Sequence, residues 1–436
     1  MRPNLVLITL DTVRADHLSC YGYEGQQTPA IDRIAAEGVL FDAAVGSGTW
    51  TLPSHASLFT GLSVSQHGAR YNVAGRDGIN YHRINCLGTE PSTLAEVLRE
   101  KKYLTAGVGA GIWLNPKFGL ARGFEHYEAR VESWAGVPAD EVTDSGIRLI
   151  SKRRENQPFF LFLNYFDAHA PYAPPAGYHP DAVPDARSPN LVEMEINRDG
   201  MRLSEAESRQ LRALYDGEIR FVDDQISRLW AHLEAEGLWE DTWIIITADH
   251  GESFGDHRFF GHGLRTWQDV IRVPLVMKLP AELGSSMGPG QVVSDAVQPK
   301  DCFPTIVASL GLRMPSGVED VHLLDGTARR PVVTEAFRSY AAIRKFGGGF
   351  DLDERSIVYD GYKLIKRSDG SRDLYRLDED PGELANLAPQ ESERVEQLSA
   401  WLTQWVRHSG MVTFDAPAAS ISNDDAERLR SLGYLD

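Results

Sequence analysis

The chain has 436 residues, which is enough for two or three average domains or for one large α/β core with a smaller attachment. Its 62 acidic residues outnumber its 44 basic ones, and the formal net charge of -18 opposes binding to nucleic acid or to anionic membranes. Three widely spaced cysteines form no CxxC motif, so a reducing compartment fits best. No stretch approaches the roughly 20 apolar residues of a membrane span, and the apolar run 5–10 is too short for a signal sequence. We therefore expect a cytoplasmic protein without a nucleic-acid or membrane partner.

Apolar strand patterns alternate with helical patterns along most of the chain. NLVLITL (4–10) and PFFLFLNYF (158–166) have the composition of buried strands, whereas 28–38 and 92–102 have helical spacing. Further strands are predicted at DTWIIITADHG and VPLVMKLP, after a charged helical segment over 204–236. This alternation is typical of a mixed α/β sheet.

The character of the sequence changes near residue 331. PVVTEAF, SIVYDGYKLIKR and RDLYRLDED read as antiparallel strands with turns at DG and SDGS, and a helix follows. We therefore divide the chain into a catalytic domain, residues 1–330, and a C-terminal α+β subdomain, residues 331–436. The stretch 170–203 is rich in Pro, Asp and Asn and has little periodicity, so we expect a surface excursion near the site that could form a lid.

Two polar signals follow predicted strands. Asp11 comes directly after the first strand, and Asp249 and His250 end a later one. Ligands of open α/β sheets bind beyond the carboxyl ends of the strands, so these side chains can converge although they are distant in sequence. A carboxylate and an imidazole suit Mn or Zn better than an all-oxygen Ca site. Taken singly, each signal also fits a turn or a cap.

The segment SGTWTLPSHASLFTG, residues 47–61, predicts a helix start, because Pro53 suits a first helical turn. The free N–H groups at such a helix end attract an anion. Thr51, just ahead of Pro53, is in the simplest interpretation an N-cap. A free threonine hydroxyl is a poor nucleophile, and no Ser-His-Asp relay is evident, so a catalytic role for Thr51 requires a metal ion beside it.

Seven motifs, in order, carry a family resemblance that spans nearly the whole chain. They are LITLDTVRADHLSCYGY, TLPSHASLFTG, QHGARYN, FDAHAPY, DHGESFGDHRFFGHG, IRVPLV and LYRLDEDPGELANLA. Together they resemble the sulfatase family of the alkaline phosphatase superfamily. The resemblance implies a large mixed, mainly parallel sheet flanked by helices, a smaller C-terminal subdomain, and a divalent metal ion held by Asp11, Asp249 and His250 together with Thr51.

The departures from the family pattern are as informative as the matches. Thr51 stands where classical sulfatases carry the Cys or Ser that becomes formylglycine, a modification that threonine cannot undergo. His55 replaces the signature arginine, His262 replaces a lysine, and GAGIW (109–113) lacks the lysine and histidine of the family's GKWHxG segment. Several cationic sulfate-binding groups are thus missing, and the pattern is similar to the phosphodiesterase and phosphotransferase branches, where an unmodified threonine attacks phosphorus. The chain also resembles phosphonate monoester hydrolases.

The resemblance also suggests roles for further residues. Relatives in those branches often hold two metal ions, and Asp167, His169 and His262 would form a reasonable second Zn or Mn site. In the alternative, which we weigh equally, His169 and His262 hydrogen-bond to substrate oxygens. His55 is assigned to substrate binding. His67 and Arg70 are candidate contacts to the substrate or to the nucleophile loop, or belong to a solvated loop.

We therefore expect a metal-dependent hydrolase of phosphate esters, whether phosphodiesters, phosphonates or phosphomonoesters. In this hypothesis Thr51 attacks phosphorus, and water activated by a second metal or by His169 or His262 releases it again. The alternatives are a sulfate-ester hydrolase that works without formylglycine, a phosphoryl-group transferase, and a non-catalytic binding protein that kept the fold. The sequence leaves open the leaving group of the small-molecule ester and the choice between Mn, Zn and Ca, and it does not exclude a homo-oligomer.

Overall fold

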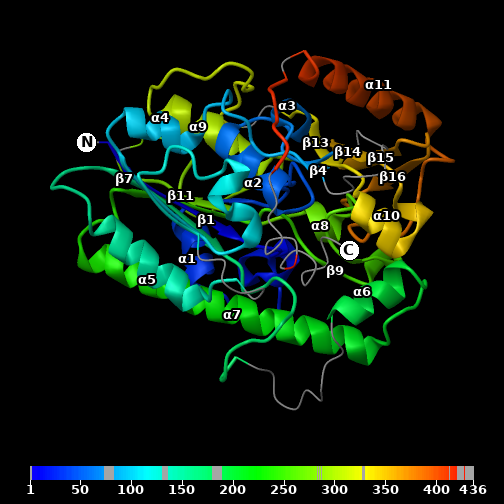
Figure 1. Ribbon diagram of the computed structural model, residues 1–436, viewed down its shortest axis with the longest axis horizontal. Coiled ribbons are helices and arrows are strands. Elements are labelled where there is room, and N and C mark those ends of the chain that lie inside the picture. The colour runs from blue at the N-terminus through cyan, green and yellow to red at the C-terminus, as the bar shows by residue number, and fades with distance from the viewer. Residues whose placement is uncertain are drawn as a thin grey trace.

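An eight-stranded mixed sheet forms the centre of the molecule, with strand order β12-β2-β11-β8-β1-β7-β5-β6 (Figure 1). Strand β11 runs antiparallel to both of its neighbours, β2 and β8, and the other pairs are parallel. The computed structural model describes residues 2–72, 83–129, 136–178, 189–281, 283, 285, 287–326, 329–411, 413–419 and 427. The predicted mixed, mainly parallel sheet is confirmed. Its strands are β1 (Asn4–Leu10), β2 (Val39–Phe41), β5 (Leu104–Gly109), β6 (His126–Ala129), β7 (Phe159–Tyr165), β8 (Thr242–Thr247), β11 (Leu275–Lys278) and β12 (Gln291–Val293).

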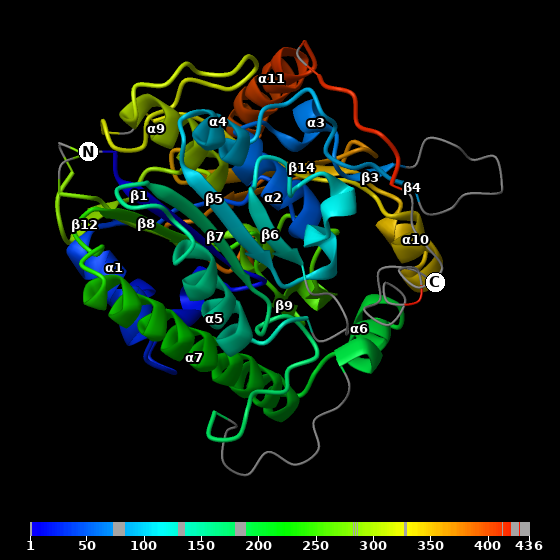
Figure 2. The same cartoon turned by 60° about the vertical axis from the view of Figure 1, so that its left-hand side comes forward.

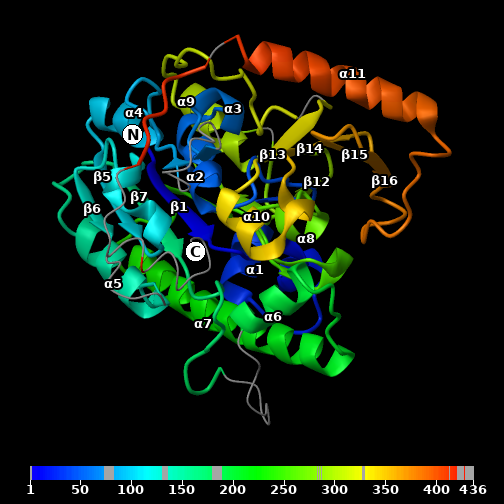
Figure 3. The ribbon, with the colours of Figure 1, turned by 45° about the vertical axis from the view of Figure 1, so that its right-hand side comes forward.

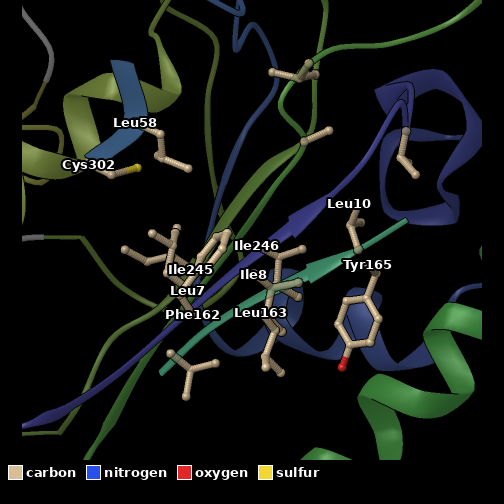
Figure 4. Close-up of a cluster of buried hydrophobic side chains, with 14 of the residues drawn as sticks. Leu7, Ile8, Leu10, Leu58, Phe162, Leu163, Tyr165, Ile245, Ile246 and Cys302 are labelled. Atoms are coloured by element: carbon tan, nitrogen blue, oxygen red, sulfur yellow. The ribbon is translucent and has the colours of Figure 1, made fainter. Parts of the chain in front are cut away.

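The three central strands are buried along their whole length, which explains their continuous apolar sequences. Leu7 of β1 is in register with Phe162 of β7 and Ile245 of β8, and these side chains form one row of the core (Figure 4). Because side chains alternate along a strand, Ile8 and its partners in β7 and β8 form a row on the opposite face. The packed strands hold their carboxyl ends in a fixed register.

Helices cover both faces of this sheet (Figure 2). On one face lie α1 (Pro29–Glu37), α5 (Ala139–Ile150) and the long α7 (Glu205–Ala235), and on the other lie α2 (Thr51–Thr60), α4 (Leu94–Glu100) and α9 (Cys302–Ser309). None of the described helices combines the length and apolarity needed to cross a membrane. The remaining short elements of this part are α3 (Val64–His67), α6 (Pro189–Asn197), α8 (Gln268–Ile271), β3 (Tyr71–Asn72), β4 (Arg83–Ile84), β9 (Ser253–Phe254) and β10 (Phe260–Gly261).

The excursion expected over 170–203 contains a helix that its composition did not suggest. Within α6, Val192 and Ile196 lie four residues apart and pack into the main core. Glu193 on the same helix pairs with Lys345 of α10 (Tyr340–Phe346), with 2.7 Å between Oε2 and Nζ. Tertiary contacts therefore order this helix, although the surrounding sequence is polar. Residues 179–188 of the predicted excursion lie outside the described residues.

The C-terminal part forms a separate four-stranded antiparallel sheet, as predicted (Figure 3). Its strands are β13 (Val332–Ala336), β14 (Glu354–Tyr359), β15 (Tyr362–Arg367) and β16 (Arg372–Arg376), and α11 (Ser392–Ser409) packs on β15. The DG turn joins β14 to β15, and both of its residues have positive φ, 54° for Asp360 and 76° for Gly361, as two-residue hairpins require. The first strand of this sheet also contacts the loop before α2, because the N–H of Glu335 donates to the carbonyl of Ser47 at 3.0 Å.

Candidate metal centre and nucleophile

Asp11, Asp249 and His250 lie together at one edge of the central sheet. Strands β1 and β8 are parallel neighbours, and Thr9 is in register with Thr247, so the residues that follow the two strands meet in space. One potential ligand atom from each of the three side chains lies within 4.8 Å of the other two. Nε2 of His250 is 3.4 Å from Oδ2 of Asp249 and 4.0 Å from Oδ1 of Asp11. The convergence that the sequence predicted is therefore present in the fold.

This cluster fits a divalent cation. The oxygens that face His250, Oδ1 of Asp11 and Oδ2 of Asp249, are buried and accept no hydrogen bond within the protein. Burial, and then the neighbouring Asp249 carboxylate, raises the pKa of Asp11 well above its ordinary value, and burial likewise raises the pKa of Asp249. Two buried carboxylates with unsatisfied oxygens are costly unless a cation lies between them.

His250 has the tautomer that a metal ligand needs. Its Nδ1 donates to the carbonyl oxygen of Gly251 at 2.9 Å, so the lone pair lies on Nε2, on the side of the two carboxylates. Burial lowers the pKa of His250 well below its ordinary value and favours the neutral ring. A ligating histidine commonly uses its second nitrogen in this way, and two carboxylates with one imidazole suit Mn or Zn.

The backbone and an asparagine hold the two carboxylates in place. Oδ1 of Asp249 accepts from the N–H of His250 at 2.9 Å and from the N–H of Thr12 at 3.3 Å. Thr12 has a positive φ of 61°, an unusual conformation for a β-branched residue, which costs roughly 1–3 kcal/mol and is typical of functional sites. Asn164 donates to Oδ2 of Asp11 at 3.5 Å. We did not predict Asn164, although an asparagine inside the apolar run FFLFLNY was a usable signal.

Thr51 is the first residue of α2, and its backbone is helical. The N-cap position belongs to Trp50, and no side chain caps this helix end, so the simple N-cap interpretation of Thr51 is wrong. The Thr51 side chain is fully buried, and its Oγ1 lies 3.5 Å from Nε2 of His250. The hydroxyl is therefore next to the atom that faces both carboxylates.

His55 and His67 both bond to α2, the helix that begins with Thr51. In His55, Nδ1 donates to the carbonyl oxygen of Thr51 at 2.8 Å, and Nε2 accepts from the hydroxyl of Thr9 at 2.9 Å. In His67, Nε2 lies 3.0 Å from Oγ of Ser57, and Nδ1 accepts from a backbone N–H. Both rings are completely buried. The expected substrate contact of His55 is corrected accordingly, because both of its nitrogens already bond to the protein. Of the three roles expected for His67, its bond to Ser57 of α2 fits contact with the segment that carries Thr51.

The contacts of Arg70 connect it to the C-terminal sheet. Its guanidinium lies 3.6 Å above the ring of Phe337, just after β13, and its neighbour Tyr71 stacks on Trp50 with ring centroids 4.2 Å apart. The segment QHGARYN thus reaches the residue before Thr51 through Tyr71. None of the described contacts joins the Arg70 guanidinium to Thr51 or to the metal-ligand cluster.

His169 and His262 lie beside the cluster. The His262 ring centroid is 4.3 Å from that of His250 and 5.1 Å from that of His169. Nδ1 of His169 donates to the carbonyl oxygen of Ala170 at 2.7 Å, and Nδ1 of His262 lies 3.0 Å from Oε1 of Glu252. Burial lowers the pKa of both histidines to about 3.

Asp167 does not join these two histidines. Its Oδ1 accepts from the N–H of Ala139 at the start of α5, at 3.0 Å, and burial raises its pKa to about 7. The described residues contain a single three-residue group with metal-ligand geometry, and it does not include Asp167. Among the described residues, Asp167, His169 and His262 therefore do not form the expected second metal-ligand group, and the alternative that His169 and His262 hydrogen-bond to substrate oxygens stays a prediction.

Glu252 is a further buried residue of the site, and it was not predicted from the sequence. It is 1% exposed, and burial raises its pKa to about 7, although the nearby His169 and His250 lower that pKa. Its signal was its position in DHGE, two residues after a metal-ligand candidate.

Fold and site together define a hydrolase of the alkaline phosphatase superfamily. Residues 3–312 match the Sulfatase family, and the chain belongs to that family. It is 30% identical to the multifunctional alkaline phosphatase superfamily protein PehA of Trinickia caryophylli, with 82% of each chain covered. It is 25% identical to an arylsulfatase of Clostridium perfringens, covering 91% of this chain and 93% of that protein. The crystal structure of a phosphonate monoester hydrolase of Agrobacterium radiobacter has the same fold, with a TM-score of 0.73, 24% identity, and 93% and 96% of the two chains covered.

Proposed function

We propose that this sulfatase-family hydrolase cleaves phosphate esters with Thr51 as the nucleophile. One observation carries the proposal: the Thr51 hydroxyl lies 3.5 Å from Nε2 of His250, beside the unsatisfied oxygens of Asp11 and Asp249. A threonine with only a structural role would not have to lie beside His250 and the two carboxylates. The presence of Asp11, Asp249 and His250 as one group also argues against a non-catalytic binding protein that has kept only the fold.

Asp11, Asp249 and His250, with Oγ1 of Thr51, would hold one divalent cation, for which Mn or Zn is our choice. When bound, such an ion supplies positive charge that stabilises the threonine alkoxide and the phosphoryl oxygens. The N–H groups at the start of α2 add positive potential on the same side.

In the first step, Oγ1 of Thr51 gives its proton to a neighbouring imidazole, His169 or His262, and forms a bond to phosphorus. The bond to the leaving oxygen breaks, its electron pair stays on that oxygen, and the proton then passes to the leaving oxygen or to solvent. In the second step, water attacks phosphorus, the bond to Oγ1 breaks, and Thr51 is regenerated. His169 and His262 are the candidate proton carriers, because they lie next to His250 and are neutral through burial.

The charges near Thr51 favour a singly charged ester. Asp11, Asp249 and Glu252 are acidic, while burial lowers the pKa of the surrounding histidines. A phosphodiester or phosphonate monoester brings one negative charge, whereas a phosphomonoester brings about two near pH 7. The name of one similar protein, a phosphonate monoester hydrolase, agrees with this choice.

A sulfate ester is also singly charged, and the chain is 25% identical to an arylsulfatase. Hydrolysis of sulfate esters is therefore the second candidate function. Against it stand His55 and His262, which replace the cationic groups of classical sulfatases. Both are buried, and burial lowers the pKa of each, so neither provides a fixed positive charge.

The test is release of nitrophenol from bis(p-nitrophenyl) phosphate with Mn or Zn supplied, comparing the wild type with Thr51→Ala and assaying p-nitrophenyl sulfate in parallel. We expect diester turnover that Thr51→Ala abolishes while metal content stays unchanged. Turnover of the sulfate alone would overturn the substrate class, and diester turnover that survives in Thr51→Ala would overturn the nucleophile.

A further inference from the structure

Glu252 is a buried carboxylate whose hydrogen-bond partner is a histidine of the site. Its Oε1 lies 3.0 Å from Nδ1 of His262, and only 1% of its side chain is exposed. The buried Tyr172 hydroxyl lies nearby and interacts with the same carboxylate. The metal-ligand group among the described residues does not include Glu252. A buried carboxylate is retained at a cost unless it is bonded, and here the bond goes to an imidazole.

We propose that Glu252 is a positioning residue that acts through His262 in the hydrolysis of the Thr51 intermediate. This inference rests on the proposed function. With Glu252 ionised, its Oε1 accepts the bond, so the His262 proton lies on Nδ1 and the lone pair lies on Nε2 at the opposite edge of the ring. Such a carboxylate–histidine pair fixes both the tautomer and the orientation of the ring.

The proton transfers then balance. Nε2 of His262 takes a proton from the attacking water as its oxygen bonds to phosphorus. The bond from phosphorus to Oγ1 of Thr51 breaks, and the electron pair stays on Oγ1. The proton on Nε2 then passes to Oγ1, which restores both Thr51 and His262. The contact of the His262 ring with His250, whose Nε2 lies 3.5 Å from Oγ1 of Thr51, keeps these groups close together.

This arrangement distinguishes His262 from His169. Nδ1 of His169 donates to a neutral backbone carbonyl, that of Ala170, whereas His262 is bonded to a carboxyl group. A carboxylate partner stabilises a ring that gains a proton more than a carbonyl does. The water-activating role therefore belongs to His262.

The experiment is rapid-mixing kinetics with bis(p-nitrophenyl) phosphate. Nitrophenolate leaves in the first step and needs little help from an acid, so Glu252→Ala should slow the second step selectively. We expect a burst of about one nitrophenolate per active site, followed by steady-state turnover about 10- to 100-fold below wild type. Intact mass should reveal a nitrophenyl-phosphoryl adduct, absent when Thr51→Ala is added. Equal slowing of burst and steady state, or loss of the metal ion, would overturn the positioning role.

Two control variants sharpen the result. Glu252→Gln keeps an acceptor oxygen for Nδ1 of His262 but not the negative charge, so its steady-state rate should lie between that of Glu252→Ala and that of the wild type. Glu193→Gln changes a neighbouring carboxylate that pairs with Lys345, with 2.7 Å between the charged atoms, and should show no burst. A burst in Glu193→Gln equal to that in Glu252→Ala would contradict the assignment.

A measurement that needs no activity separates this inference from the proposed function. Nitrogen-15 spectra of labelled histidine, assigned with His262→Asn, should show the Nδ1–H tautomer of His262 in the wild type and its loss in Glu252→Ala. The opposite tautomer in the wild type would overturn the Glu252 contact. Absence of Thr51-dependent diester turnover together with the expected tautomer would instead count against the proposed function, and with it against the step assigned to His262.

Discussion

Nδ1 of His55 donates to the carbonyl oxygen of Thr51 at 2.8 Å, one helical turn back along α2. The bond is the end of a chain, because Asn164 donates to Oγ1 of Thr9 at 3.1 Å and Thr9 donates to Nε2 of His55 at 2.9 Å. Asn164 also contacts Asp11. Thr51 is thus connected through the side chains of His55, Thr9 and Asn164 to Asp11, the metal-ligand candidate that follows β1.

We expect His55→Ala to lower kcat by about 100-fold, since a shift of Thr51 by roughly 1 Å has an effect of that size. It should also lower the free energy of unfolding by about 1–3 kcal/mol, because the variant leaves buried polar groups unsatisfied. His67→Ala is the matched control, since His67 bonds to the same helix at Ser57, further from Thr51, and should cost stability with less effect on kcat. A rise in KM at unchanged kcat in His55→Ala would return His55 to substrate binding.

Metal removal should abolish diester turnover and destabilise the protein. A cation that binds only the folded chain at about 100 times its Kd adds roughly 2.7 kcal/mol to the free energy of unfolding. Chelation should therefore lower Tm, and Mn or Zn should restore both Tm and activity. Asp249→Asn should make Tm respond less to chelation and to added metal, because the substitution changes the carboxylate whose Oδ2 accepts no hydrogen bond within the protein. An unchanged Tm and rate after chelation would contradict the assigned centre.

The sheet and the metal-ligand group could be predicted because their signals are local. Continuous apolar strands such as NLVLITL and FFLFLNY require burial on both faces, and Asp11, Asp249 and His250 stand where such strands end. Strand pairing then brings the ends together, so no knowledge of side-chain direction was needed.

The predictions that failed depended on side-chain direction, which the sequence does not show. Asp167 follows β7 as Asp11 follows β1, yet its carboxylate accepts the N–H of Ala139, because the start of α5 lies within reach. His55 aligns with a cationic position of the family but faces inward to Thr9. The helix α6 was missed because its order comes from packing against distant residues.

Asp167→Asn tests the number of metal ions. Since the carboxylate contacts the start of α5 and lies outside the metal-ligand group, the variant should bind the same number of Mn or Zn ions as the wild type. Diester turnover should stay within about threefold of the wild-type rate, because Asp167 lies outside the proposed site and substitutions at such positions have small effects. Metal content measured by mass spectrometry provides the check, and loss of one equivalent of metal in the variant would restore the two-metal hypothesis.

Glu218 should make stability fall as pH rises. Burial raises its pKa to about 8, whereas an unfolded glutamate titrates near about 4.3. The folded state therefore holds the proton more tightly, and its contribution to stability is full below about pH 4 and is lost as pH rises toward about 8. Glu218→Gln keeps an acceptor for the N–H of Ala173 and imitates the protonated form. The free energy of unfolding, measured with denaturant, should differ less between pH 5 and pH 8 in the variant than in the wild type. An equal difference in the two proteins would contradict the assignment.

The charge of the site predicts the order of substrate preference. With Asp11 and Asp249 around one divalent cation and Glu252 close by, a second negative charge on the substrate adds repulsion, and the nearby Arg14 guanidinium is already paired with Asp16 and Asp256. We expect kcat/KM for bis(p-nitrophenyl) phosphate to exceed that for p-nitrophenyl phosphate by at least about tenfold, which corresponds to about 1.4 kcal/mol in the transition state. Glu252→Gln removes one negative charge and should narrow this ratio. A ratio that favours the monoester would contradict this charge argument.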